Sequence, residues 1–357
     1  MCVLAALSAA CSGGGGADGA ASEAPADSPI PQPTPASPDT EDDGGDGSAA
    51  LTEPCNLPHR SEVVVADAAA LRTALSDARA GTLIRLAPGI YAGRYTVEAS
   101  GTADDPIVVC GGRDSVLDGG SVQTGYVFHF KNVSHWVLSG LTITRGKNGV
   151  MLDASSDNLL TGLAIHDVGQ SAVHFRRNSS DNVLSYSAIR DTGLYEPGYG
   201  EGVYIGSAVG NWAEVMGAAD TPDRSDRNRV LNNTIGPGVA AEHVDVKEGT
   251  SDGLLRGNVF DGTGLSGVNS GDSWVDVKGN GYRIAANTGR AALRDGFQLH
   301  VRVGGWGRDN VFEDNIARVD ADGYGFALDR GGVGNVVRCD NIVERAGAGY
   351  ADVACTP

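Results

Sequence analysis

The segments HVDVK (243–247) and WVDVK (274–278) are two copies of one short phrase, and the recurrence of this phrase decides the fold. In each copy two apolar residues flank one polar residue, which is the period-2 pattern of a strand with one buried face. The other copies are GVMLD (149–153), AVHFR (172–176), GVYIG (202–206), GFQLH (296–300) and GFALD (325–329). Successive copies lie 23, 30, 41, 31, 22 and 29 residues apart, so a short coil carries insertions of varying length.

A second phrase follows the first after a turn. It reads SDNLLTGLAI (156–165), SDNVLSYSAI (180–189), DRNRVLNNTI (226–235), SDGLLRGNVF (251–260), RDNVFEDNIA (308–317) and VGNVVRCDNI (333–342). Short strands in repeats of this length predict an all-β solenoid, a parallel β-helix. Its turn asparagines are expected to stack as ladders: Asn158, Asn182, Asn228, Asn310 and Asn335.

The sequence predicts a capping helix at the N-terminal end of the solenoid and disulfides near both ends. The segment AAALRTALSDARA (68–80) has helical periodicity and precedes TLIRLAPGIY (82–91), so we expect a capping helix over the open apolar end. Four cysteines lie near the two ends of the folded region, and of the three possible connectivities we favour Cys55–Cys110 and Cys339–Cys355.

The net charge and the hydropathy of the chain exclude some classes of function. The 357 residues include 45 Asp and Glu against 27 Lys and Arg, a net charge of -18, which argues against a nucleic-acid partner. No apolar run is long enough to span a bilayer. We therefore expect a soluble monomer.

The N-terminus predicts export. CVLAALSAA (2–10) followed by Cys11 is typical of a lipoprotein signal (1–11), although a plain secretory signal with an incidental cysteine is the alternative. Residues 12–52 lack Lys, Arg and almost all large apolar side chains, so we expect an acidic disordered tether. The β-helix domain would span 53–357, outside the cell or at its surface, with a lipid at Cys11 as the membrane contact.

Aligning the copies predicts which residues stack on neighbouring coils. The middle outward row is Met151, His174, Tyr204, Asp245, Asp276, Gln298 and Ala327. Asp over Asp and Lys over Lys at a spacing of about 4.8 Å is unfavourable, so we interpret these charges as a site. A diagonal Asp–Lys lattice that only solvates the wall is the alternative. Insertions 206–242 and 249–273 flank these coils and would wall a groove.

Three segments carry a family resemblance. ALRTALSDARAGTLIRLAPGIYAG (70–93), GEGVYIGS (200–207) and the pair of Glu242 with Val246-Lys247 resemble polysaccharide lyase family 6, the chondroitinase B and alginate lyase type. The resemblance implies a single-stranded right-handed parallel β-helix, a lysine base and a glutamate that helps hold calcium. This chain departs from the pattern at Ala240, where the family has a second glutamate, and it lacks an arginine near Val268. Lys278, Arg294 or Arg302 would substitute for that arginine.

We therefore expect a metal-assisted β-elimination on a uronic-acid polysaccharide. Lys247 is the expected base, which requires a depressed pKa that Lys278 and Arg176 would supply. Without a cation the neighbouring carboxylates would raise that pKa, so the lyase interpretation predicts metal dependence. The expected site residues are Lys247, Lys278, His243 and Arg176 for catalysis, Tyr204, Trp274, Gln298, His300 and Arg302 for substrate, and Glu201, Glu242, Asp245 and Asp276 for Ca²⁺.

Other functions remain open at this point. A non-catalytic glycan-binding or structural surface solenoid would need the aromatic contacts but not the lysine. A uronate epimerase would remove the same proton. A glycoside hydrolase is disfavoured, because carboxylates on adjacent coils lie closer than the roughly 6.5–9.5 Å that an inverting enzyme needs.

Overall fold

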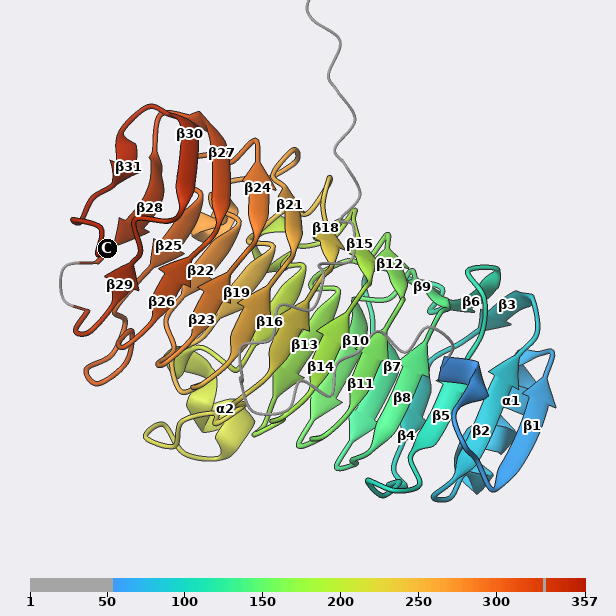
Figure 1. Cartoon of the computed structure of the whole chain (residues 1–357). Helices are drawn as coiled ribbons and strands as arrows, with labels where there is room; N and C mark the ends of the chain where they lie inside the picture. The colour runs from blue at the N-terminus through green and yellow to red at the C-terminus, as the bar shows by residue number, and fades with distance from the viewer. Residues whose placement is uncertain (1–53, 330–331) are drawn as a thin grey trace, which may run out of the picture. The chain divides into compact units, whose positions relative to one another are not determined.

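The computed structural model describes residues 54–329 and 332–357, which form a parallel β-helix of three sheets (Figure 1). Each strand pairs in parallel with the equivalent strand of the next coil. The fold expected from the repeats, an all-β right-handed parallel β-helix, is confirmed. The predicted signal and tether lie outside the described residues, and they stay predictions.

The three sheets are numbered in the order in which the chain enters them. The first contains β1 (Ser61–Val65), β2 (Thr82–Leu86), β5 (Ile107–Cys110), β8 (Trp136–Ser139), β11 (Leu159–Thr161), β14 (Val183–Ser185), β17 (Arg229–Leu231), β20 (Leu254–Arg256), β23 (Arg283–Ala285), β26 (Val311–Glu313) and β29 (Val336–Val337). The second contains β3 (Gly89–Ala92), β6 (Ser115–Asp118), β9 (Thr142–Thr144), β12 (Ala164–His166), β15 (Ala188–Ile189), β18 (Thr234–Ile235), β21 (Val259–Asp261), β24 (Thr288–Arg290), β27 (Ile316–Ala321) and β30 (Ile342–Ala346). The third contains β4 (Tyr95–Val97), β7 (Tyr126–Lys131), β10 (Asn148–Asp153), β13 (Val173–Arg176), β16 (Val203–Ile205), β19 (Val244–Val246), β22 (Val275–Val277), β25 (Phe297–Leu299), β28 (Tyr324–Leu328) and β31 (Gly349–Ala351).

Helix α1 (Ala68–Asp77) covers the N-terminal end of the core, as expected. It begins at the cap Asp67, whose Oδ1 accepts hydrogen bonds from the backbone N–H of Ala69 at 2.9 Å and of Ala70 at 2.8 Å. It ends three residues earlier than predicted, because Ala78 takes an extended conformation (φ -58°, ψ 139°). Strand β1, which the repeat pattern did not predict, adds an edge strand to β2.

The other helical segments are short. They are η1 (Pro54–Asn56), η2 (Pro197–Tyr199), η3 (Val209–Asn211), α2 (Trp212–Met216) and η4 (Val268–Ser270). Within the described ranges no helix is long and apolar enough to cross a membrane. Three of these segments, η3, α2 and η4, lie in the two predicted insertions beside the third sheet.

The core is a stack of identical positions from successive coils. The inward row that begins with Val150 and continues through Val173 and Val203 has no exposed surface. Burying each such side chain stabilises the fold by about 1.5–3 kcal/mol. The predicted asparagine ladders are also present: Asn158 Nδ2 donates to Asn182 Oδ1 at 2.9 Å, and Asn310 Nδ2 donates to Asn335 Oδ1 at 3.0 Å. The ladders satisfy buried turn groups that would otherwise destabilise the coil.

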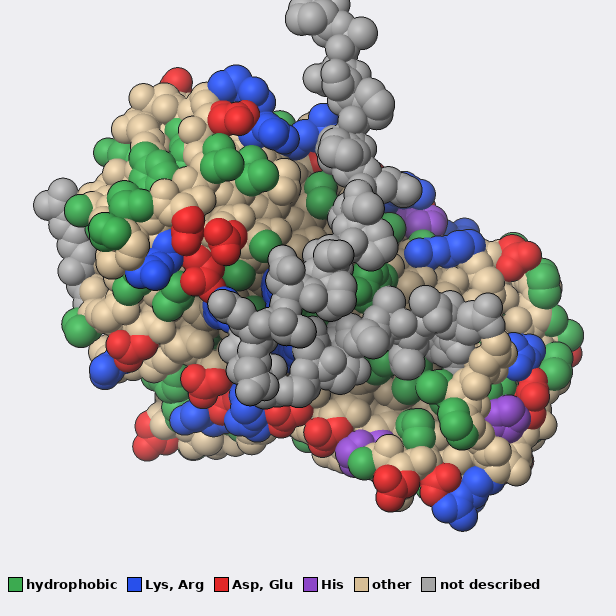
Figure 2. All heavy atoms as spheres, viewed as in Figure 1, with side chains coloured by type: hydrophobic (Ala, Val, Ile, Leu, Met, Phe, Trp, Pro, Cys, Tyr) green, Lys and Arg blue, Asp and Glu red, His purple; other side chains and the backbone are tan. Residues whose placement is uncertain are grey.

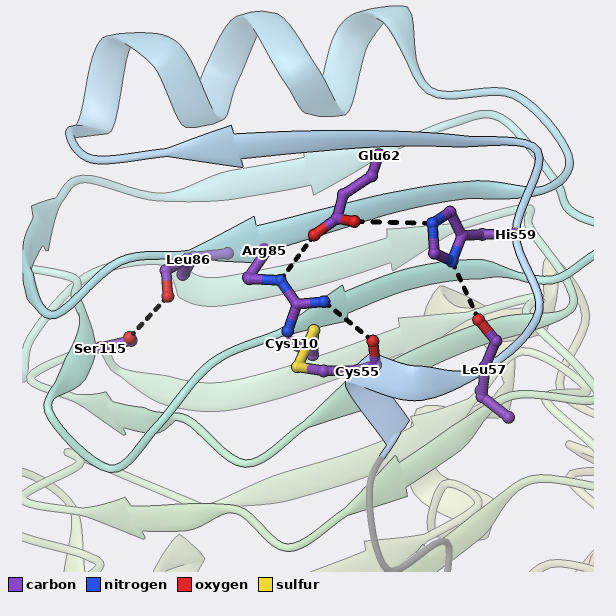
Figure 3. The surroundings of a disulfide bond; sticks show 8 residues. All are labelled: Cys55, Leu57, His59, Glu62, Arg85, Leu86, Cys110 and Ser115. Carbon is purple, nitrogen blue, oxygen red and sulfur yellow. Dashed lines mark hydrogen bonds and ion pairs between the residues drawn. A yellow bond between two sulfur atoms is a disulfide. The ribbon is translucent and has the colours of Figure 1, made fainter.

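Both predicted disulfides form, Cys55–Cys110 and Cys339–Cys355. Figure 3 shows the first one joining η1 to strand β5, with Arg85 beside it. Arg85 donates from Nη2 to the Cys55 carbonyl at 3.0 Å and from Nε to Glu62 at 2.6 Å. Two disulfides are typical of an oxidising compartment.

Candidate functional site

The predicted stacking register on the third sheet is confirmed. Tyr204 pairs with Asp245, Asp245 with Asp276, and Asp276 with Gln298 on four successive coils. Because side chains alternate along a strand, these residues share one face, opposite the apolar core. Strands β16, β19, β22 and β25 thus bring the charged residues of the predicted site together.

The middle outward row was expected to face solvent, but the charged residues of this row are buried. Asp245 and Asp276 are each 2% exposed, and Gln298 is 5% exposed. A chain segment on each side of this row contributes to a cavity above it: Ala208 and Val209 on one side, and Asn269 and Ser270 on the other. Both predicted insertions therefore contribute to the walls of the site, which is a cavity and not a flat surface.

The cavity has a volume of about 290 Å³. Its lining residues are Ala208, Val209, Glu242, Lys247, Glu248, Asn269, Ser270, Asp276, Lys278 and Arg302. Sequence reasoning missed Glu248, although it directly follows Lys247, because it lies beyond the aligned strand. Glu248 Oε1 accepts a hydrogen bond from the Val209 backbone N–H at 2.6 Å, so this carboxylate holds the wall segment in place.

The two lysines have different surroundings. Lys278 Nζ lies 2.8 Å from Asp245 Oδ1 and 2.6 Å from Asp276 Oδ2, and its side chain is 5% exposed. Lys247 Nζ lies 2.5 Å from Asp245 Oδ2, and its side chain is 13% exposed. The diagonal Asp–Lys lattice therefore exists around Lys278. Lys247 is the lysine that keeps more freedom at the cavity.

The pKa of Lys247 differs from the sequence expectation. Burial acts to lower this pKa, but the charge and hydrogen bond of Asp245, together with Glu201, outweigh burial, and the pKa is raised. Arg176 does not oppose this effect, since its guanidinium pairs with Asp153, with Nε 2.6 Å from Oδ1. The depression expected from Lys278 and Arg176 is therefore not found for this arrangement of side chains, because the neighbouring carboxylates raise the pKa instead.

Three carboxylates form a buried cluster beside Lys247. Ligand oxygens of Glu201, Glu242 and Asp245 all lie within 4.8 Å of one another. Burial, followed by the charge of Asp245, raises the pKa of Glu201 to about 7 and raises the pKa of Glu242 well above its ordinary value. Since Ca²⁺ binds carboxylate oxygens at about 2.3–2.6 Å, oxygens on opposite sides of one ion would have this separation. The three residues therefore fit a hard divalent cation.

Asp276 does not join this carboxylate cluster, contrary to expectation. One of its oxygens pairs with Lys278 and the other accepts from His300 Nδ1 at 2.9 Å. Gln298, expected to bind substrate, donates from Nε2 to Asp272 at 2.8 Å and to Asp295 at 2.9 Å. These side chains satisfy one another and stiffen the C-terminal side of the site.

Tyr204 lies directly beside the candidate base. Lys247 Nζ lies over the Tyr204 ring, 5.0 Å from the ring centroid, and His174 packs edge-on against the same ring at 4.4 Å. Burial, followed by the charge of Asp245, raises the pKa of Tyr204 well above its ordinary value. The phenol therefore keeps its proton.

The predicted outward orientation of Trp274 and His243 is wrong. Both are fully buried, with Trp274 Nε1 donating to the Arg290 carbonyl at 3.0 Å and His243 Nε2 within 2.8 Å of the Asp261 carbonyl. Each precedes its strand at the bend between the second and third sheets, where the side chain turns into the core. Gly289 makes this possible, since a Cβ there would overlap the Trp274 ring.

The two remaining predicted residues, Arg176 and Arg302, differ in their position: only Arg302 lines the cavity. Arg176 is held by Asp153 and the Tyr126 hydroxyl, so it contacts the N-terminal part of the wall and not Lys247. Arg302 is exposed and lines the cavity, and in the described part of the chain its guanidinium has no hydrogen-bond or ion-pair partner. An unpaired cation at a cavity suits an anionic ligand.

Charge elsewhere on the surface is mixed. Figure 2 shows acidic and basic side chains interspersed over one face, without a large basic patch on the visible part. Attraction of an anionic polymer would therefore depend on the local cations of the cavity.

Comparison with solved structures identifies the relatives. An alginate lyase from Paenibacillus sp. str. FPU-7 is 37% identical to this chain, which it matches with a TM-score of 0.77 over 83% of this chain and 99% of its own. The chain belongs to the family of this alginate lyase. Pectate lyase Pel9A matches with a TM-score of 0.56 and 16% identity over 84% of this chain and 80% of its own, which shows the shared fold. No protein-family model matches the chain, and no curated protein does. The lyase resemblance inferred from the sequence is thus confirmed, and a polysaccharide lyase is the class of enzyme that this relationship supports.

Proposed function

We propose that this polysaccharide lyase cleaves a uronic-acid polymer by β-elimination, with Lys247 as the base. The observation that carries the proposal is the position of the Lys247 amine, at a cavity, beside the carboxylates of Glu201, Glu242 and Asp245 and over the Tyr204 ring. A polyuronate of the alginate kind is the proposed substrate, because the relative that is 37% identical is an alginate lyase.

The side chains supply the two proton transfers that elimination needs. Lys247 Nζ takes the proton from the carbon next to the uronate carboxylate, and the carbon–oxygen bond to the leaving sugar breaks as the new double bond forms. The Tyr204 hydroxyl, which is protonated at neutral pH, gives its proton to the leaving oxygen. The products are an unsaturated uronate end and a shortened chain.

A divalent cation, proposed as Ca²⁺, fits the carboxylates of Glu201, Glu242 and Asp245. When bound, the cation supplies positive charge that neutralises the substrate carboxylate. A cation held there would compete with Lys247 for Asp245 and would weaken the ion pair that holds the proton on the lysine. Arg302 provides a second positive group for the uronate, and Lys278 keeps Asp276 neutralised at the back of the cavity.

Export is part of the proposal. Two disulfides indicate an oxidising compartment, and the sequence CVLAALSAA (2–10) before Cys11 suggests a lipid-anchored surface protein. A polymer too large to enter a cell would be cut at this location.

The test is the absorbance of unsaturated uronate ends, measured with the full chain and a panel of polyuronates, with and without added Ca²⁺. We expect a signal that needs Ca²⁺ and that Lys247→Ala lowers at least about 100-fold. Lys131→Ala is the matched control, since Lys131 is an exposed lysine of the same sheet that pairs with Glu98. Polymer binding without any new unsaturated ends would instead favour the non-catalytic glycan-binding alternative. Inversion of a uronate without chain cleavage would favour an epimerase.

A further inference from the structure

Five large hydrophobic side chains are exposed on the loops that join the second sheet to the third, beside the cavity. We call them the apolar ridge: Leu194, Tyr195, Tyr199, Val268 and Leu293. Tyr195 is 45% exposed and Tyr199 is 57% exposed. Exposed apolar side chains gathered in one region of a monomer mark a binding surface more often than isolated ones do.

Contacts between the loops make the ridge continuous. Asn269 Nδ2 donates to the Gly198 carbonyl at 3.0 Å, which joins the loop of Val268 to the loop of Tyr199. A Cβ on Gly198 would lie 2.9 Å from Val268 Cγ1, so the two loops touch. A Cβ on Gly267 would lie 3.1 Å from Leu293 Cδ2, which places Leu293 against the same loop.

The ridge also continues into the cavity. Val268 precedes Asn269 and Ser270, and both of these residues line the cavity that contains Lys247. The loop therefore presents polar groups to the cavity and an apolar side chain to the ridge. A polymer held at the cavity would meet the ridge with the sugars next along its chain.

The tyrosines are exposed on a loop that is well held. The backbone N–H of Tyr195 donates to the Gly169 carbonyl at 3.1 Å, and the N–H of Tyr199 donates to the Glu196 carbonyl at 3.0 Å. Leu194 N–H donates to the Val168 carbonyl at 3.1 Å. Rings on such a fixed loop lose little conformational entropy when a ligand stacks on them.

We propose that the apolar ridge binds pyranose rings of the same polysaccharide, beyond the sugars held at the cavity. This inference rests on the proposed function and extends it, from a cleavage site to a surface that grips a long chain. The C–H faces of sugar rings stack on tyrosine, and the phenol hydroxyl reaches a sugar hydroxyl. Such contacts need no charge, which suits a protein of net charge -18 that binds an anionic polymer.

The experiment compares a long polyuronate with its trisaccharide. Binding is measured by calorimetry in the full chain carrying Lys247→Ala, with and without Tyr195→Ala and Tyr199→Ala. We expect the affinity for the long chain to fall roughly 2- to 10-fold for each tyrosine, the range for one lost aromatic stacking contact. The affinity for the trisaccharide should fall less, so the advantage of the long chain shrinks. Tyr186→Ala is the matched control, because Tyr186 is 41% exposed at the turn between the first and second sheets.

The outcomes separate this inference from the proposed function. The ridge proposal alone is overturned by two results together. The wild type cleaves polyuronate, and the variant with both Tyr195→Ala and Tyr199→Ala still prefers the long polymer to the trisaccharide as strongly as the chain with both tyrosines does. A wild-type chain that neither binds nor cleaves any polyuronate overturns both. If the double variant loses its native circular dichroism, Tyr199→Leu removes the ring and carries the same expectation. Dimerisation of the wild type that Tyr199→Ala abolishes would also overturn the proposal, because a second copy would then be the occupant.

Discussion

Lys278, which directly follows strand β22, donates a hydrogen bond from Nζ to Asp245 Oδ1 on the neighbouring strand β19, at 2.8 Å. The same amine lies 2.6 Å from Asp276 Oδ2, so one cation serves two stacked carboxylates. Stacked like charges destabilise a sheet, and this bridge offsets their repulsion. Among the described residues, Lys247 pairs with Asp245 alone, whereas Lys278 pairs with two carboxylates, so the two lysines are expected to behave differently.

Replacing Lys278 should cost stability. Lys278→Ala leaves Asp245 and Asp276 buried without their shared cation, and we expect a loss of about 3–5 kcal/mol in the free energy of unfolding. Lys247→Ala should cost less, since Asp245 keeps Lys278. Urea denaturation of the two variants measures the difference. Equal losses would mean that the bridge is not the main partner of the buried carboxylates.

Removing the Tyr204 hydroxyl should slow cleavage without removing the ring that packs on Lys247. We expect Tyr204→Phe to lower kcat about 100-fold or more, because the leaving oxygen loses its proton donor. The affinity for polymer should change little. Steady-state kinetics on polyuronate provide the measurement, and Tyr186→Phe is the control. An unchanged kcat would assign the proton donor to another group.

Calcium should stabilise the fold through the three carboxylates. At a concentration 100 times the Kd, a ligand that binds only the folded state adds about 2.7 kcal/mol. We expect Ca²⁺ to raise Tm in the wild type, and the double variant Glu201→Gln, Glu242→Gln to lose this rise. Glu98→Gln, which changes an exposed glutamate paired with Lys131, is the control. A rise in Tm that persists in the double variant would place the cation elsewhere.

The contribution of His243 to stability should decrease as the pH falls from about 6.5 to 4, whereas the raised pKa values of Glu201 and Glu242 act in the opposite direction. Burial lowers the pKa of His243 from 6.5 to about 4. In that window His243 is protonated in the unfolded chain but not in the folded chain, so its protonation makes unfolding more favourable as the pH falls. At about 1.4 kcal/mol per pKa unit, the contribution is roughly 3 kcal/mol.

The measurement is the free energy of unfolding at a series of pH values, with His243→Gln as the comparison. As the pH falls through this window, the stability of the variant relative to that of the wild type should increase. A slope identical to that of the wild type would mean that His243 becomes protonated as easily in the folded chain as in the unfolded one.

Trp274 should affect folding and not sugar contact. Trp274→Ala removes a fully buried indole beside Phe297, and we expect a loss of about 3–5 kcal/mol. Trp274→Phe should recover part of this loss. Thermal unfolding measures the cost, and polymer affinity of the folded Trp274→Phe variant provides the contrast. A large loss of affinity in that variant, with normal stability, would restore the surface role expected from the sequence.

The repeat was readable because a β-helix obeys local rules. Period-2 alternation in HVDVK (243–247) and WVDVK (274–278) was enough to stack Asp245 on Asp276, since neighbouring coils must align their apolar rows. The disulfide pairing was similarly readable, because two of the four cysteines lie towards one end of the folded region and two towards the other.

The sequence by itself therefore determined the coil, the register and the identity of the stacked charges. Only the tertiary structure decided how each of these residues is used. The bends between sheets turned Trp274 and His243 into the core, because side-chain direction there does not follow strand alternation. Residues of the insertions line a cavity together with Asp276, and the sequence did not reveal this because loop paths depend on contacts with other coils, such as the bond between Asn269 and Gly198. The distinction between Lys247 and Lys278 arose in the same way, since it depends on which carboxylates lie within reach in three dimensions.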